Sequence, residues 1–155
     1  MKRPAYLEIS PRQTGKTERL ITLAQGRQDA GRNVCFTTRQ KEEIQRRLPG
    51  ALVLGPKGRF PASLNPDDYD WFFDEFDWLK TAEFVDGGFY STTPRFLRAV
   101  GADPAGDLLL ELLQASGNVL TRNYWSFDMA DVLREARGAY SESEFRRFYL
   151  GEFYE

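Results

Sequence analysis

The chain has 155 residues, with 21 Lys and Arg against 23 Asp and Glu and a formal net charge of −2. This length predicts one domain, residues 1–155, with room for a hydrophobic core. Because the chain has no histidine and one cysteine, histidine triads, histidine metal sites and an internal disulfide are excluded. No apolar run is long enough to cross a bilayer and no signal peptide is visible, so we expect a cytoplasmic protein with no membrane partner.

Positive and negative charges are separated along the chain. Residues 1–60 hold 13 Lys and Arg against 5 Asp and Glu, whereas residues 61–155 hold 8 against 18. A basic half of this kind predicts contact with nucleic acid or with the acidic half of a neighbouring copy. A basic helix surface that is simply solvated is the alternative.

The first half of the chain alternates between strand and helix patterns. Short apolar runs predict four strands, at residues 5–9, 34–37, 51–55 and 69–73. Helical spacing predicts two helices, at residues 16–30 and 39–48. Proline, glycine and aspartate between residues 56 and 68 predict a loop.

The second half has weaker strands and more helices. Possible strands lie at residues 84–90 and 119–124. Helices are predicted at residues 95–101, 107–116, 128–137 and 142–151. The alternation predicts an α/β layered domain with a mainly parallel sheet flanked by helices, like that of P-loop NTPases.

Aromatic side chains are expected to fill the core. One group lies in the fourth strand: Trp71, Phe72 and Phe73. A second group, at helical spacing, is expected to pin the last helix to the sheet: Phe145, Phe148, Tyr149 and Phe153.

A candidate phosphate-binding loop follows the first strand. Its residues are Ser10, Pro11, Arg12, Gln13, Thr14, Gly15, Lys16 and Thr17. Gly15 lets backbone N–H groups approach phosphates, Lys16 reaches the β- and γ-phosphates, and the Thr17 hydroxyl ligates Mg²⁺. Ser10 departs from the usual pattern, which has glycine at this position. The residues predict that ATP and Mg²⁺ are the cofactors.

Two carboxylates end the strong aromatic strand. Asp74 and Glu75 follow Phe72-Phe73, in the order expected for an aspartate that holds Mg²⁺ and a glutamate that deprotonates the attacking water. The neighbourhood is acidic throughout, so a solvated acidic surface is the alternative interpretation.

Small hydroxyl residues end the next predicted strand. Ser91, Thr92 and Thr93 precede Pro94, and such side chains can sense the γ-phosphate by switching hydrogen bonds. Thr93 is also a plausible N-cap for a helix that starts at Pro94. The two roles are compatible, because a cap would fix the strand end.

Four segments, in order, resemble the ATPase domain of the large terminase subunit of tailed phages, the motor that packages double-stranded DNA. The loop at residues 10–17 is similar to the family's phosphate loop, which tolerates a missing first glycine. Residues 72–75 resemble its acidic strand, residues 91–94 its coupling motif, and residues 144–153 the aromatic segment that closes the domain.

The resemblance implies roles for individual residues. Lys16 would contact the β/γ-phosphates, Thr17 and Asp74 would hold Mg²⁺, and Glu75 would be the catalytic base. Arg12 would reach the γ-phosphate, and Thr92 and Thr93 would couple hydrolysis to movement.

The resemblance also implies partners: double-stranded DNA without sequence specificity, and a homo-oligomeric ring or other packaging proteins, in the host-cell cytoplasm if the protein is viral. In such rings a neighbouring subunit often supplies an arginine, for which Arg39, Arg46 and Arg47 are candidates. The basic stretch at residues 39–59 is the best candidate for a DNA groove.

Two features depart from the family: nine residues precede Ser10 in this sequence, and its 155 residues include no nuclease domain, as expected of a separate ATPase subunit, a reduced relative or an excised domain. A nucleotide-binding regulatory or packaging accessory protein with little turnover is therefore an alternative. A small-molecule kinase is a third reading, with residues 56–66 as a short lid, but the Asp74-Glu75 pair suits water better as acceptor.

Overall fold

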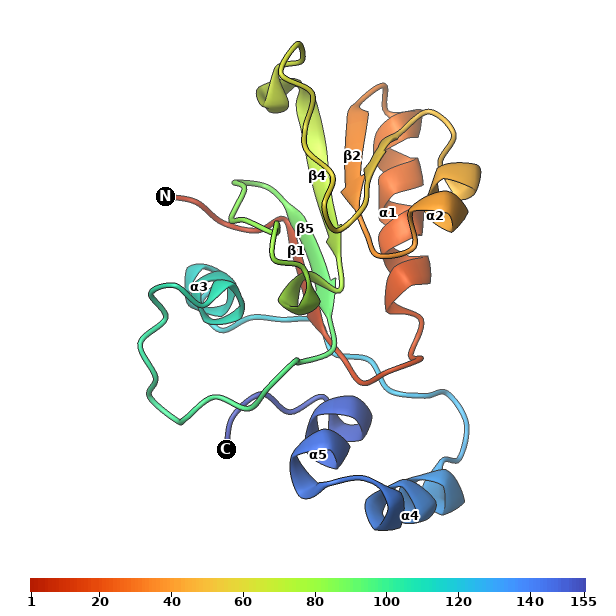
Figure 1. Ribbon diagram of the computed structural model, residues 1–155, viewed down its shortest axis with the longest axis vertical. Coiled ribbons are helices and arrows are strands. Elements are labelled where there is room, and N and C mark those ends of the chain that lie inside the picture. The colour runs from red at the N-terminus through yellow and green to blue at the C-terminus, as the bar shows by residue number, and fades with distance from the viewer.

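The computed structural model describes residues 1–155 and contains a five-stranded sheet flanked by helices (Figure 1). The strands are β1 (Tyr6–Ile9), β2 (Asn33–Thr37), β3 (Leu52–Leu54), β4 (Tyr69–Asp74) and β5 (Phe89–Thr92). Their order is β1-β5-β4-β2-β3, and every neighbouring pair is parallel. The carboxyl ends of all five strands therefore share one edge of the sheet.

Helices cover both faces of the sheet and its carboxyl edge. The α-helices are α1 (Lys16–Asp29), α2 (Lys41–Arg47), α3 (Leu108–Ala115), α4 (Ala130–Ala139) and α5 (Glu142–Leu150), with short 3-10 helices η1 (Pro66–Asp68) and η2 (Phe76–Trp78). In Figure 1, α1 and α2 lie on one side of the sheet and α3 on the other, with α4 and α5 below the carboxyl ends of the strands. None of the helices is both long and apolar enough to span a membrane.

Two hydrophobic clusters lie on the two faces. Phe72 belongs to the cluster beneath α1 and α2, and the next residue, Phe73, belongs to the cluster beneath α3. Successive residues of a strand point to opposite faces, so one aromatic run serves both layers. The prediction that Trp71, Phe72 and Phe73 are core residues is confirmed.

Two of the predicted strands are wrong: the one at residues 84–90 in part, and the one at residues 119–124 entirely. β5 begins only at Phe89, because residues 84–88 turn: Gly87 has φ 73°, and the Val85 N–H donates to the Tyr90 hydroxyl at 2.8 Å. The segment 119–124 forms a single bridge, between Thr121 and Glu8, and no strand.

The predicted helix at residues 95–101 is absent. Arg98 instead pairs with the C-terminal segment: its N–H donates to Phe153 at 2.7 Å and its carbonyl accepts from Glu155 at 2.8 Å. The Arg98 side chain is buried and ion-paired with Asp77 and Asp107. These long-range contacts hold Arg98 in a bridge to the C-terminal segment, although the sequence pattern around it favours a helix.

The last helix, α5, lies below the carboxyl ends of the strands (Figure 1), and of the four aromatic residues expected to pin it to the sheet only Phe153, which follows the helix, joins a core cluster of the sheet. It begins with a capping box formed by Ser141 and Glu144 and ends at Gly151, whose φ of 68° suits glycine. Phe148 O accepts from the Arg12 N–H at 2.8 Å. A side-chain carbon at Gly151 would lie 3.1 Å from Pro11. Helix α5 therefore packs against the loop at the carboxyl edge, because its own aromatic face meets residues 10–12.

Candidate functional site

The loop at residues 10–15 connects β1 to α1 at the carboxyl edge of the sheet. Gly15 has φ 88° and Gln13 has φ 55°, so the chain turns sharply before Lys16 begins the helix. Within the loop, the Thr14 hydroxyl donates to the Pro11 carbonyl at 2.9 Å. In parallel α/β sheets, ligands bind at this carboxyl edge, and backbone N–H groups at a helix start suit anions.

Lys16 is nearly buried, with 5% of its side chain exposed. Its ammonium group donates to the Pro11 carbonyl at 3.0 Å and lies 3.3 Å from the Glu75 carboxylate. The loop therefore brings a buried cation to the end of β4, although β5 separates β1 from β4 in the sheet.

Asp74 ends β4 and is buried. Its two oxygens accept hydrogen bonds from the Thr17 hydroxyl at 3.0 Å and the Thr38 hydroxyl at 3.1 Å. Burial, with the negative charge of Glu75, raises the pKa of Asp74 to about 6 against these hydrogen bonds. Its ionised form is therefore only partly compensated by the chain.

Thr17 and Asp74 fit a Mg²⁺ site of the kind completed by a nucleotide. The hydroxyl and the carboxylate are hard oxygen donors in direct contact, and the carboxylate forms no ion pair, because the nearby Lys16 pairs with Glu75. The chain has no cluster of three or more Asp, Glu, Cys or His side chains that could hold a metal alone. Mg²⁺ usually takes one or two protein ligands and completes its shell with phosphate oxygens and water.

Glu75 has a left-handed backbone, with φ 54° and ψ 49°. This conformation costs a non-glycine residue about 1–2 kcal/mol, so the surroundings must hold it. One carboxylate oxygen accepts from the Thr93 N–H at 3.1 Å, and the other faces Lys16. The strained turn keeps the carboxylate against Lys16 at the start of α1 and Thr93 after β5, with 28% of its side chain exposed.

Thr92 and Thr93 connect the loop to the Glu75 turn. The Thr93 hydroxyl donates to the Ser10 carbonyl at 2.9 Å, while the Thr92 hydroxyl accepts from the Asp77 N–H at 3.3 Å. One pair of threonines thus touches both the start of the loop and the residues that follow β4. No helix starts at Pro94, so Thr93 is not the helix cap that its sequence suggests.

The side chain of Arg12 extends from the loop and contacts α5. Its guanidinium stacks on the Phe148 ring at 3.6 Å, and it lines a cavity of about 150 Å³ together with Arg39, Glu75, Trp78 and Thr93. Of the three arginines suggested for a neighbouring subunit, Arg39 is in this cavity of its own chain. Arg47 pairs with Glu18 on α1.

Glu8 is a buried residue at this site that the sequence analysis missed. It is fully buried in β1 and accepts hydrogen bonds from four side chains: Tyr6, Ser10, Arg19 and Asn123. Arg19 also donates to the Thr14 carbonyl at 2.7 Å. Ser10, where glycine was expected, therefore anchors the loop to Glu8. A charged residue inside an apolar strand was the available signal.

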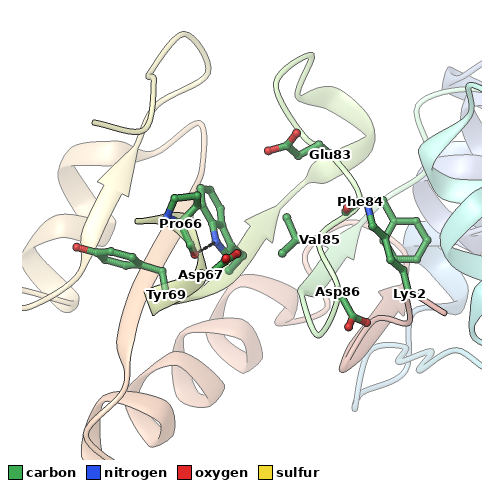
Figure 2. A pocket seen from close by; sticks show the side chains of 9 residues that line it. Lys2, Pro66, Asp67, Tyr69, Glu83, Phe84, Val85 and Asp86 are labelled. Atoms are coloured by element: carbon green, nitrogen blue, oxygen red, sulfur yellow. Dashed lines mark hydrogen bonds between the residues drawn. The ribbon is translucent and has the colours of Figure 1, made fainter. Parts of the chain in front are cut away.

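A second hollow, of about 500 Å³, lies at the opposite end of the sheet (Figure 2). It is lined by residues that precede or begin strands, including Lys2, Pro66, Tyr69 and Phe84. Its three exposed carboxylates, on Asp67, Glu83 and Asp86, outnumber its one lysine, the exposed Lys2, and no threonine lines it. It therefore offers no site for phosphates.

No known family model, curated protein or solved structure matches this chain significantly. Function is therefore inferred from the residues of the site itself.

Proposed function

We propose that this protein is a Mg²⁺-dependent P-loop ATPase, similar in kind to the motor domain of phage terminases. The observation that carries the proposal is the convergence of Lys16, Asp74 and Glu75 at one edge of the sheet. Thr17 and Asp74 are 57 positions apart in the chain and 3.0 Å apart at the site. A buried cation, a metal-binding pair and an adjacent carboxylate suit a polyphosphate substrate and an attacking water.

Each side chain has a distinct task in the proposed reaction. Lys16 would neutralise the β/γ-phosphates from its place beside the loop, and Arg12 would reach the γ-phosphate. Thr17 and Asp74 would hold Mg²⁺, which neutralises phosphate charge when bound. Glu75 would orient a water and accept its proton.

The contacts of Thr93 support a coupling role. Its N–H holds Glu75 and its hydroxyl holds Ser10, so a change at the γ-phosphate would reach the start of the loop through Thr92 and Thr93. The end of β5 is thus a candidate route from hydrolysis to movement. Helix α5, which packs against the loop at residues 10–12, lies next on this route.

Double-stranded DNA is the proposed track. Six Lys and Arg lie in the stretch 39–59, all exposed, and only Arg47 among them forms an ion pair. Free surface cations suit sequence-independent contacts with phosphates. Affinity for DNA should then fall steeply as salt rises, and a flat salt response would contradict this part of the proposal.

Steady-state phosphate release from ATP with Mg²⁺, with and without double-stranded DNA, tests the proposal. Lys16→Ala is the variant, and Lys80→Ala, which removes an exposed lysine outside both the site and the basic stretch, is the matched control. We expect turnover in the wild type and in Lys80→Ala, with stimulation by DNA in both. We expect no turnover in Lys16→Ala.

Other outcomes separate the alternatives. Tight ATP binding that depends on Lys16, without turnover at any protein concentration, would favour the nucleotide-binding accessory protein. Turnover that Lys16→Ala leaves intact would overturn the proposed site.

A further inference from the structure

The cavity of about 150 Å³ beside Glu75 contains two arginines from separate parts of the chain. Arg12 comes from the loop after β1, and Arg39 comes from the turn after β2. Glu75, Thr93 and Trp78 line the same cavity. Both arginines therefore border one small cavity together with the proposed catalytic base.

The backbone around Arg39 is held in place by Thr38. The Thr38 N–H donates to Leu54 at 3.0 Å, and its hydroxyl accepts from the Gln40 N–H at 3.1 Å while donating to Asp74. Helix α2 starts only at Lys41, later than the sequence predicts, so Arg39 belongs to this turn and not to the helix. The proposed metal-binding aspartate and Arg39 are thus positioned by one threonine.

The charge at the cavity is not balanced by the chain. No carboxylate lies within 4 Å of the guanidinium of Arg12 or Arg39, whereas Arg19, Arg27 and Arg98 each have one. Guanidinium groups bind phosphate oxygens well, in a two-pronged geometry. The volume is below the roughly 300–1,000 Å³ of sites for drug-sized ligands, so a single phosphoryl group fits better than a nucleoside.

We propose that Arg39 acts within its own chain as a second arginine on the γ-phosphoryl group, together with Arg12. This inference rests on the proposed ATPase function and refines it. A water oxygen would bond to the γ-phosphorus while the bond to the bridging oxygen breaks and its electron pair stays on ADP. The water proton would pass to Glu75, and Arg39 would neutralise charge on the γ-oxygens. The products are ADP, inorganic phosphate and one proton.

Arg39 is then expected to act on the site of its own chain and not on that of a neighbouring subunit. It was one of three candidates to act on a neighbouring subunit, and its cavity contains the Glu75 of its own chain. Arg46, which lies on α2 and is exposed and without an ion pair, remains free for that role.

Arg39→Ala tests the proposal, with Arg3→Ala, which removes an exposed arginine before β1, as the matched control. We expect kcat to fall at least about 10²-fold in Arg39→Ala, since it loses a group that stabilises transition-state charge. Affinity for ADP should stay unchanged, Arg39→Lys should restore part of kcat, and Arg3→Ala should leave ATP turnover unchanged. Thermal melting checks that the variants fold.

Mixing two inactive variants separates action within the chain from action between chains. Arg39→Ala mixed with Glu75→Gln should show no more turnover than the two alone, because each site then lacks one group. Turnover well above that of either variant would mean that a neighbour supplies Arg39, and would overturn the proposal.

The remaining outcomes are also decisive. If the wild type hydrolyses ATP and Arg39→Ala is equally active, only the role of Arg39 is overturned. A wild type that binds ATP without turnover should still lose about 10-fold or more of its ATP affinity in Arg39→Ala; unchanged ATP affinity overturns the inference. A wild type that binds neither ATP nor ADP overturns the proposed function, and the inference with it.

Discussion

Two buried carboxylates, Glu8 on β1 and Asp74 on β4, lie opposite the same residue of β5, Ser91. Glu8 accepts hydrogen bonds from Tyr6 and three further side chains, whereas Asp74 accepts from two threonine hydroxyls. Burial would raise the pKa of both. In Glu8 the bonds from Arg19 and its neighbours outweigh burial and lower the pKa, while in Asp74 the pKa rises to about 6.

The difference distinguishes a structural carboxylate from a candidate functional one. Glu8 is saturated by its own chain and ties β1, the loop and α1 together. Asp74 keeps unused acceptor capacity beside Glu75, and perturbed carboxylates of this kind concentrate at functional sites. Glu8 and Asp74 are therefore similarly buried in one sheet but differ in role, because different numbers of hydrogen-bond donors surround the two carboxylates.

The largest expected effect concerns Glu75, beside Asp74. Glu75→Gln keeps the shape of the side chain but cannot accept a proton, so turnover should fall at least ~10²-fold while ATP binding persists. Single-turnover kinetics with a parallel binding titration measure both quantities. Glu83→Gln, an exposed glutamate away from the site, is the control. Turnover equal to that of the wild type would remove Glu75 from the mechanism.

The second prediction tests the structural side of the comparison. Glu8→Gln places an amide NH₂ beside the Arg19 guanidinium, which can only donate, and it removes the charge that pairs with Arg19. Loss of a buried charge pair of this kind should lower the free energy of unfolding by about 3 kcal/mol. Urea unfolding followed by circular dichroism measures the change. Stability unaltered by the substitution would show that the Glu8 cluster does not hold the loop.

The matched substitution at the other carboxylate should cost much less. In Asp74→Asn the two threonine hydroxyls can turn to accept from the amide, and the poorly compensated charge disappears. The free energy of unfolding should stay within about 1 kcal/mol of the wild type. Mg²⁺-dependent enhancement of ATP binding should be lost at the same time. A destabilisation as large as that of Glu8→Gln would end the distinction between the two carboxylates.

The smallest effect is a change in the pH dependence of stability. The pKa of Glu8 lies below its ordinary value of 4.5 in the folded chain. The ionised form therefore stabilises the fold above that value, and this contribution is lost as pH falls from about 4.5 through the lowered pKa. Between pH 6 and acid, the wild type should lose more stability than Glu8→Gln, because other carboxylates are common to both. Parallel slopes from urea unfolding would contradict the prediction.

Much of the fold was predictable because it depends on near neighbours. The apolar runs at β1, β2, β3 and β4 and the spacing of α1 were recognised to within one or two residues. The capping box at Ser141 and the left-handed Gly151 set the ends of α5 by local geometry. One failure is local, at the turn around Gly87, and another lies where distant contacts override the pattern, at Arg98, whose ion pairs with Asp77 and Asp107 hold its segment.

The candidate site was predictable in its residue types and not in its full membership. Motif spacing identified Lys16, Thr17, Asp74 and Glu75, since strand ends and the loop must meet at one edge of a parallel sheet. It could not reveal Glu8 as the anchor of the loop, because that role needs donors from β1, α1 and the segment near Asn123 at once.

By itself, the sequence determined the first four strands, the loop and the order of the proposed catalytic groups, because backbone preferences and strand polarity act locally. Tertiary structure alone decided which charges are satisfied. Long arginine side chains can reach many partners, so only packing assigned Arg19 to Glu8 and Arg98 to its two aspartates, and left Arg12 and Arg39 unpaired beside Glu75.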